Sequence, residues 1–208
     1  TALTTVSAGT LKITNNSGLG TTGAGVTVVS GATLDLDNVT IGAEAVTLNG
    51  DGVSGVGALT GTGTSSLSGA ITLASSSTIG GAGTLTLSGI ISDSTSTFNL
   101  TKTGAGTVIL SAANTYDGAT NINQGILRAG IAGAIASTNM LSLANVAGAS
   151  FDLNGLAQTV GNLSGGGSLG GNISLGAATL TVTQSMSGTY SGVISGTGGL
   201  TKNGAGEL

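Results

Sequence analysis

Eight carboxylates and four basic side chains are the only charged side chains in this 208-residue sequence. Asp35 and Asp37 lie two residues apart, so on a strand they would share one face, where a carboxylate pair could cleave a glycosidic bond or bind calcium. In a related segment, however, Asp152 repeats Asp35 but Asn154 replaces Asp37. Asp51 could also bind calcium, but no repeated calcium-binding motif surrounds it. We therefore predict no catalytic, metal-binding or cofactor-binding residue.

The side chains on which most enzyme chemistry depends are absent. The sequence has no His, Cys, Pro or Trp. It therefore offers no thiol nucleophile, no imidazole acid or base, no His or Cys metal ligand and no disulfide. We expect a protein that is not an enzyme and that requires no cofactor.

The charge balance limits the partners. The net charge is −4 and the isoelectric point is near 4.2. Four basic residues cannot form a positive patch, which argues against nucleic acid and anionic membranes as partners. The charge-free run 52–92 is rich in Gly, Ser and Thr, unlike the roughly 20 apolar residues of a spanning helix. We therefore predict no membrane insertion of this segment.

Two kinds of short motif are explained by composition. Gly-x-Gly-x-x-Gly strings begin at Gly18 and Gly50, but 40 glycines produce such strings by chance, and neither is followed by a helical pattern. Asn-x-Ser/Thr strings would carry glycans only in a host that glycosylates in this way, and they begin at Asn15, Asn38, Asn99, Asn162 and Asn172.

The basic residues recur at matching places. Lys12 and Arg128 follow the same Leu in two related segments, and Lys102 and Lys202 precede the same Gly-Ala-Gly turn. We predict that they keep exposed strand edges soluble and bind no ligand.

Outward-facing Thr residues would suit an ice-binding face if they were in register on consecutive coils. Such runs occur at Thr84 and Thr86, and at Thr179, Thr181 and Thr183. Other strands place a different residue between their apolar positions, namely Lys12, Asp35, Ser142 or Ser174. The sequence therefore predicts a broken row of Thr and no ice-binding face.

Short alternating runs of apolar and polar residues extend through the whole chain. In residues 84–88, Leu85 and Leu87 would point inward while Thr86 and its polar neighbours point to solvent. The runs end at Gly, Asn or Ser, and none shows helical spacing over three turns. The 24 Leu, 13 Ile and 13 Val are spread evenly and can form a core without aromatic residues. The pattern predicts an all-β protein.

Internal repeats predict the architecture. Residues 100–108 recur at 200–208, residues 31–36 at 148–153, and residues 6–12 at 122–128. The chain thus reads as one segment, 1–208, of two related copies at about 1–106 and 107–208. From Leu36 to Leu85 is 22 residues longer than from Leu153 to Leu180, which is about one turn of a three-stranded β-helix.

A solenoid accommodates a whole extra coil, whereas added strands disrupt a sandwich or barrel. We therefore predict a right-handed parallel β-helix (β-solenoid) of about nine coils, stacked at roughly 4.8 Å per coil into a rod of about 45 Å. Glycines would occupy the corners and Asn side chains would stack in ladders there. The alternative is two tandem antiparallel sandwiches.

Residues 100–127 carry a more specific pattern. A Lys-x-Gly-Ala-Gly turn begins at Lys102, Asn-Thr-Tyr-x-Gly begins at Asn114 and Gly-x-Leu begins at Gly125. This order resembles the autotransporter-associated β-strand repeat, also called the passenger-associated transport repeat, and residues 151–164 resemble a phrase that accompanies it. The resemblance implies an exported β-helical passenger with adhesion or aggregation functions, in which the repeat assists folding during secretion. It implies no catalytic residues. The first copy departs from the pattern because no Asn-Thr-Tyr precedes Val6.

Together these features predict a non-enzymatic extracellular or cell-surface rod, an adhesin stalk or filament subunit that is part of a longer chain. The alternative is a scaffold in a glycan-binding or glycan-cleaving protein whose active part lies elsewhere. The expected partners are neighbouring repeats or further copies of the chain, and host or cell-surface glycans or proteins. Residues 202–208 begin the repeated motif, and residues 2–6 resemble the part of the motif that would follow. We therefore expect copies to stack head to tail.

Overall fold

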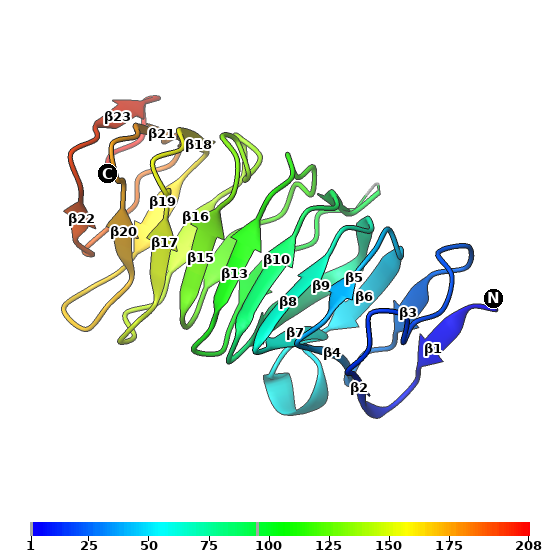
Figure 1. Cartoon of the computed structure of the whole chain (residues 1–208). Coiled ribbons are helices and arrows are strands. Elements are labelled where there is room, and N and C mark those ends of the chain that lie inside the picture. Colours follow the sequence, from blue (N-terminus) through cyan, green and yellow to red (C-terminus); the bar gives the residue numbers. More distant parts are fainter. Residues whose placement is uncertain (1, 95) are drawn as a thin grey trace.

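A computed structural model describes residues 2–94 and 96–208 of the chain. Short strands follow one another around a narrow core, and successive coils stack into a rod that begins near β1 and ends near β23 (Figure 1). The short apolar and polar alternation explains the strands, and the Gly and Asn residues between them turn the chain.

The strands of the described residues form three sheets. The twelve-stranded sheet contains β1 (Thr4–Val6), β2 (Gly9–Ile13), β3 (Val26–Val28), β4 (Ala32–Asp37), β6 (Val46–Gly50), β7 (Leu59–Thr62), β9 (Ile71–Gly81), β11 (Ile91–Ser92), β12 (Leu100–Lys102), β14 (Thr120–Ile122), β16 (Leu141–Leu143) and β19 (Leu163–Gly165). The eight-stranded sheet contains β5 (Thr40–Ile41), β8 (Thr64–Leu67), β10 (Thr84–Leu87), β13 (Thr107–Leu110), β15 (Ile126–Ala129), β17 (Ser150–Asp152), β20 (Asn172–Ser174) and β22 (Ile194–Ser195). The three-stranded sheet contains β18 (Gln158–Val160), β21 (Leu180–Thr183) and β23 (Leu200–Asn203). A 3-10 turn, η1 (Val53–Gly55), lies on a loop that projects from the rod (Figure 1).

Neighbouring strands in these sheets are parallel and belong to successive coils. β10, for example, lies between β8 and β13, with Leu87 beside Leu67 and Leu110. The prediction of a parallel β-solenoid of about nine coils is confirmed, and the alternative of antiparallel sandwiches is wrong. The separation of register partners on successive coils varies from 19 residues between Thr107 and Ile126 to 27 between Gly50 and Ser77, where β6 carries a register shift. Loops of different length are accommodated because each coil contacts only its neighbours.

The predicted inside and outside faces are also confirmed. Leu85 and Leu87 are buried, while the side chain of Thr86 between them is half-buried and Ser88 is exposed. One column of inward positions runs in register through six coils and consists of Leu34, Leu59, Ile79, Lys102, Ile122 and Leu143. Five of these are aliphatic and pack as predicted. The sixth is a lysine.

The prediction of a broken Thr row is wrong for one row of register partners in the twelve-stranded sheet. Four threonines lie in register on consecutive coils, followed by a serine: Thr5, Thr27, Thr47, Thr72 and Ser92. The Lys, Asp and Ser residues that were expected to break the row lie at other register positions, so they do not interrupt this row. A single row of small hydroxyls is no binding site by itself.

Among residues 2–94 and 96–208, no helix has the length and apolar composition needed to cross a membrane.

Candidate functional site

The acidic pair of the first coils is held by a basic residue from the neighbouring coil. Asp35 and Asp37 share a face as predicted, and the Lys12 ammonium lies 3.2 Å from Asp35 and 3.1 Å from Asp37. The Thr60 hydroxyl donates to Asp35 at 2.9 Å and the Thr62 hydroxyl donates at 3.1 Å. The pKa of Lys12 is raised, mainly by its hydrogen bond to Asp37. These carboxylates join neighbouring coils through Lys12, Thr60 and Thr62.

The second copy repeats this arrangement. The Arg128 Nε lies 2.7 Å from the Asp152 carboxylate, and the two residues are register partners, as Lys12 and Asp35 are. Lys12 and Arg128, predicted to keep strand edges soluble and to bind no ligand, thus also join neighbouring coils through ion pairs. Each faces an acid on the next coil, 23 or 24 residues later, and opposite charges one coil length apart are the signal that could have revealed these pairs.

Asp51 lies apart from these pairs. It is exposed in the loop that leads to η1, where its backbone carbonyl accepts a hydrogen bond from the Gly57 amide at 2.8 Å. The described ranges contain no group of three or more His, Cys, Asp or Glu that could hold a metal ion. Asp35, Asp37 and Asp51 are therefore not assembled into such a group.

The Asn-Thr-Tyr segment joins three successive coils. The Asn114 Oδ1 accepts a hydrogen bond from the Ile91 amide at 2.8 Å, and its Nδ2 donates to the Ala134 carbonyl at 2.8 Å. Tyr116 is fully buried, and its hydroxyl lies 2.7 Å from the Thr120 hydroxyl. Burial raises the pKa of Tyr116 to about 12, so the phenol stays neutral and contributes to packing.

Polar side chains at other corners replace missing backbone hydrogen bonds. The Asp93 carboxylate is buried and accepts from the amides of Phe98 and Asp117, each at 3.1 Å. The Gln158 Oε1 accepts from the Ala134 amide at 2.9 Å, and its Nε2 donates to the Ile131 carbonyl at 2.8 Å. Sequence reasoning missed these residues because no local spacing shows which polar side chain faces inward.

Several Asn side chains join successive coils by hydrogen bonds to the backbone. Their side-chain carbonyls accept from backbone amides of the next coil, such as Asn38 from Thr64 at 3.2 Å and Asn99 from Ala119 at 2.8 Å. Asn162 binds the Ser185 amide at 2.8 Å and Asn172 binds the Val193 amide at 2.9 Å. Four of the five Asn-x-Ser/Thr strings thus use their Asn to join coils.

Lys102 differs most from its prediction. Its side chain is buried in the aliphatic column, and its ammonium donates to three backbone carbonyls: Thr103 at 2.8 Å, Gly104 at 2.7 Å and Gln124 at 2.9 Å. Lys202, in the repeated phrase, is exposed and donates only to the Gly204 carbonyl at 3.0 Å. The prediction of a solubilising role is therefore wrong for Lys102.

Burial of Lys102 predicts an unusual pH dependence of stability. Burial lowers the pKa of Lys102 from 10.5 to about 8. Between these two values the unfolded chain binds more protons than the folded chain, so stability rises with pH. Burial raises the pKa values of Tyr116 and Tyr190 from 10.0 to about 12, which lowers stability only above about pH 10. Denaturant unfolding should therefore show a gain on the order of 1 kcal/mol from pH 8 to pH 10.

The control for this pH dependence is Lys102→Met, which keeps an unbranched side chain but removes the titrating group. Its stability should lack the rise between pH 8 and pH 10. A native chain whose stability is flat or falls over this interval would show that the Lys102 ammonium is not destabilised by burial.

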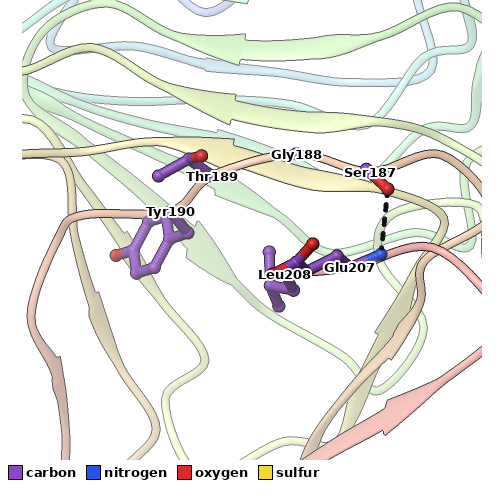
Figure 2. A pocket seen from close by; sticks show the side chains of 6 residues that line it. All are labelled: Ser187, Gly188, Thr189, Tyr190, Glu207 and Leu208. Atoms are coloured by element: carbon purple, nitrogen blue, oxygen red, sulfur yellow. Dashed lines mark hydrogen bonds between the residues drawn. The ribbon is translucent and has the colours of Figure 1, made fainter.

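A pocket of about 590 Å³ lies near the last strands and is lined by Ser187, Gly188, Thr189, Tyr190, Glu207 and Leu208 (Figure 2). The Glu207 amide donates to the Ser187 hydroxyl at 3.3 Å, and the Tyr190 hydroxyl donates to the Gly171 carbonyl at 2.7 Å. Burial raises the pKa of Tyr190 to about 12. The two hydrogen bonds engage the Ser187 and Tyr190 hydroxyls with backbone groups, and the lining holds one side-chain carboxylate, that of Glu207.

Comparison with known proteins agrees with this geometry. Residues 100–129, which contain Lys102, Asn114 and Tyr116, match the family model described as Passenger-associated-transport-repeat. A stretch of 109 residues is 49% identical to the Adhesin BmaC autotransporter of Brucella suis biovar 1 (strain 1330). That alignment covers 51% of this chain and 3% of the adhesin, so the chain spans a small part of its relative.

No solved structure matches the chain. Residues 100–129 are similar to the passenger-associated transport repeat, and the predicted resemblance to autotransporter passengers is confirmed. The segment is adhesin-like in sequence and solenoidal in structure.

Proposed function

We propose that this segment is a non-enzymatic structural rod within an extracellular or cell-surface adhesin-like passenger. The observation that carries this proposal is the use of the polar side chains. Lys12 pairs with Asp35 on the next coil, and Arg128 pairs with Asp152 in the same way. Asn114 of the Asn-Thr-Tyr segment and the buried Lys102 also bind a neighbouring coil. Side chains that are engaged in coil-to-coil contacts contribute to a rigid rod rather than to chemistry on a substrate.

The location and partners follow from the same proposal. Similarity to an adhesin autotransporter supports a place outside the cell, either anchored or secreted. The parallel stack supports neighbouring repeats as the principal partners, since each coil contacts the next along the rod. We also propose that copies of the segment associate head to tail and that the rod contacts host or cell-surface molecules. The rod itself is proposed to consist of two related copies of one unit.

A second candidate function is glycan contact by the solenoid surface. A groove of about 360 Å³ beside β18 and β21 is lined by Ser137, Thr159, Thr179 and Thr181 and by the apolar residues Ile135 and Ala157. Hydroxyls beside apolar groups could bind the hydroxyl and C–H groups of a neutral sugar. This observation supports a scaffold that binds glycans through its side and carries out no cleavage itself.

Two measurements test the proposed function. Antibodies raised against the purified segment should label intact cells that express the parent protein, and labelling that needs permeabilised cells would contradict the surface location. Incubation of the segment with a panel of polysaccharides should release no reducing ends or unsaturated products. Product that accumulates with time in proportion to protein concentration would overturn the non-enzymatic assignment.

A further inference from the structure

We propose that the carbonyl oxygens of Thr103, Gly104 and Gln124 form a binding site for an ammonium-type cation. In the native chain, the tethered ammonium of Lys102 fills this site and holds two successive coils together. The proposal concerns this chain's own architecture and does not depend on what the rod adheres to.

The first argument is the match between donors and acceptors. A lysine ammonium has three N–H donors and no acceptor. The three carbonyl oxygens lie 2.7 to 2.9 Å from the Lys102 Nζ, which is hydrogen-bonding distance for all three. Hydrogen bonds from a charged donor are stronger than those between neutral groups. A primary ammonium is therefore fully coordinated here by backbone alone.

The second argument is the surroundings of the ammonium. The register partners of Lys102 on the coils before and after it are Ile79 and Ile122, and both are buried. No ion pair joins Lys102 to a carboxylate in the part of the chain that the structure describes. A buried charge without a counter-ion is costly unless polar groups replace its hydration. The three carbonyls replace part of that hydration. Burial still lowers the pKa of Lys102, to about 8, so the site holds the charged ammonium at neutral pH.

The third argument is the role of glycine in the repeat. Gly104 and Gly125 adopt φ angles of 73° and 68°, a backbone conformation that favours glycine. A Cβ on Gly125 would lie 2.7 Å from the Lys102 Nζ and would also collide with the Gly104 carbonyl. The glycines thus leave room for the cation while the turn directs its carbonyls toward it. The Lys-x-Gly-Ala-Gly motif therefore contains both the cation, on Lys102, and two of the three carbonyls that bind it, those of Thr103 and Gly104.

The site also spans two coils. Thr103 and Gly104 follow Lys102 directly, whereas Gln124 lies on the next coil, 22 residues later. Lys202 lies on the last described coil, where its exposed ammonium donates to the Gly204 carbonyl. The third carbonyl comes only from the stacked neighbour. Occupation of the site therefore favours the stacked state of these coils.

Chemical rescue tests the proposal. Lys102→Ala removes the tethered cation and leaves a channel as long as a propylammonium ion. The variant should lose about 5 to 10 °C in thermal midpoint. n-Propylammonium chloride should restore at least half of that loss with a saturable concentration dependence. Should Lys102→Ala be unfolded in sodium chloride alone, folding on addition of n-propylammonium is the expected result.

Three controls separate a cation site from a merely filled volume. Tetramethylammonium chloride at equal ionic strength has no N–H donor and should not rescue. Neutral n-propanol matches the probe in length and should not rescue. The matched variant Lys202→Ala should change the midpoint by less than about 2 °C and gain nothing from the probe. Rescue by propanol or tetramethylammonium equal to that by propylammonium, or no rescue by any of the three, would overturn the proposal.

Discussion

Leu87→Asp is expected to reduce the free energy of unfolding by about 3 to 5 kcal/mol. Leu87 is 1% exposed, and its register neighbours are Leu67 on the preceding coil and Leu110 on the next. An aspartate at this position would bury a charge among aliphatic side chains with no basic residue as its register partner. The loss therefore combines a missing apolar side chain with an unpaired buried carboxylate.

The matched control for Leu87→Asp is Thr86→Asp, one residue earlier on the same strand. Thr86 faces outward and is half-buried, so its replacement should cost less than about 1 kcal/mol. Chemical denaturation of both variants measures the difference. Equal losses would show that β10 does not have the register described here, because a shift by one residue exchanges the two faces.

The second large effect is expected at a glycine that stacks on its neighbour. Gly89 has no positive φ, but a Cβ at this position would collide with the carbonyl group of Gly69 on the preceding coil. Gly89→Ala must therefore push the two coils apart or distort the corner between them. We expect a loss of about 3 kcal/mol or more in the free energy of unfolding.

Gly42→Ala is the control for Gly89→Ala. Gly42 also has no positive φ, and a Cβ there would meet no atom within 4 Å. Replacement should be neutral or slightly stabilising, since alanine restricts the unfolded chain more than glycine does. Similar losses for both variants would mean that backbone conformation, rather than the close approach of coils, requires glycine at position 89.

The sequence was sufficient to predict which apolar residues face the core and that parallel coils form a solenoid. Strict alternation around Leu85 and Leu87 assigns the inner face, and a tolerated change in repeat length favours a solenoid. These features depend on local geometry, which has a period of two residues in any strand. Parallel pairing then follows because each strand repeats after a whole coil.

The contacts between coils could not be predicted in the same way. Coil length varies between 19 and 27 residues, so no fixed spacing shows that Lys12 meets Asp35 or that Asn38 meets Thr64. Lys102 and Lys202 illustrate the limit most clearly, because the same phrase places one lysine in the core and the other in solvent. The coil that follows Lys102 supplies the Gln124 carbonyl, and that contact is long-range.

Disulfide trapping tests the central claim, a stack of parallel coils in fixed register, most directly. The chain has no cysteine, so paired substitutions give an unambiguous result. Thr27 and Thr47 are outward-facing register partners on adjacent coils, and Cα atoms on neighbouring strands lie about 4.8 Å apart. Thr72 lies one coil further, at about 9.6 Å from Thr27, which exceeds the reach of a disulfide. The account predicts that mild oxidation cross-links the monomer of T27C/T47C but not that of T27C/T72C, and cross-linking of the second pair without the first would contradict it.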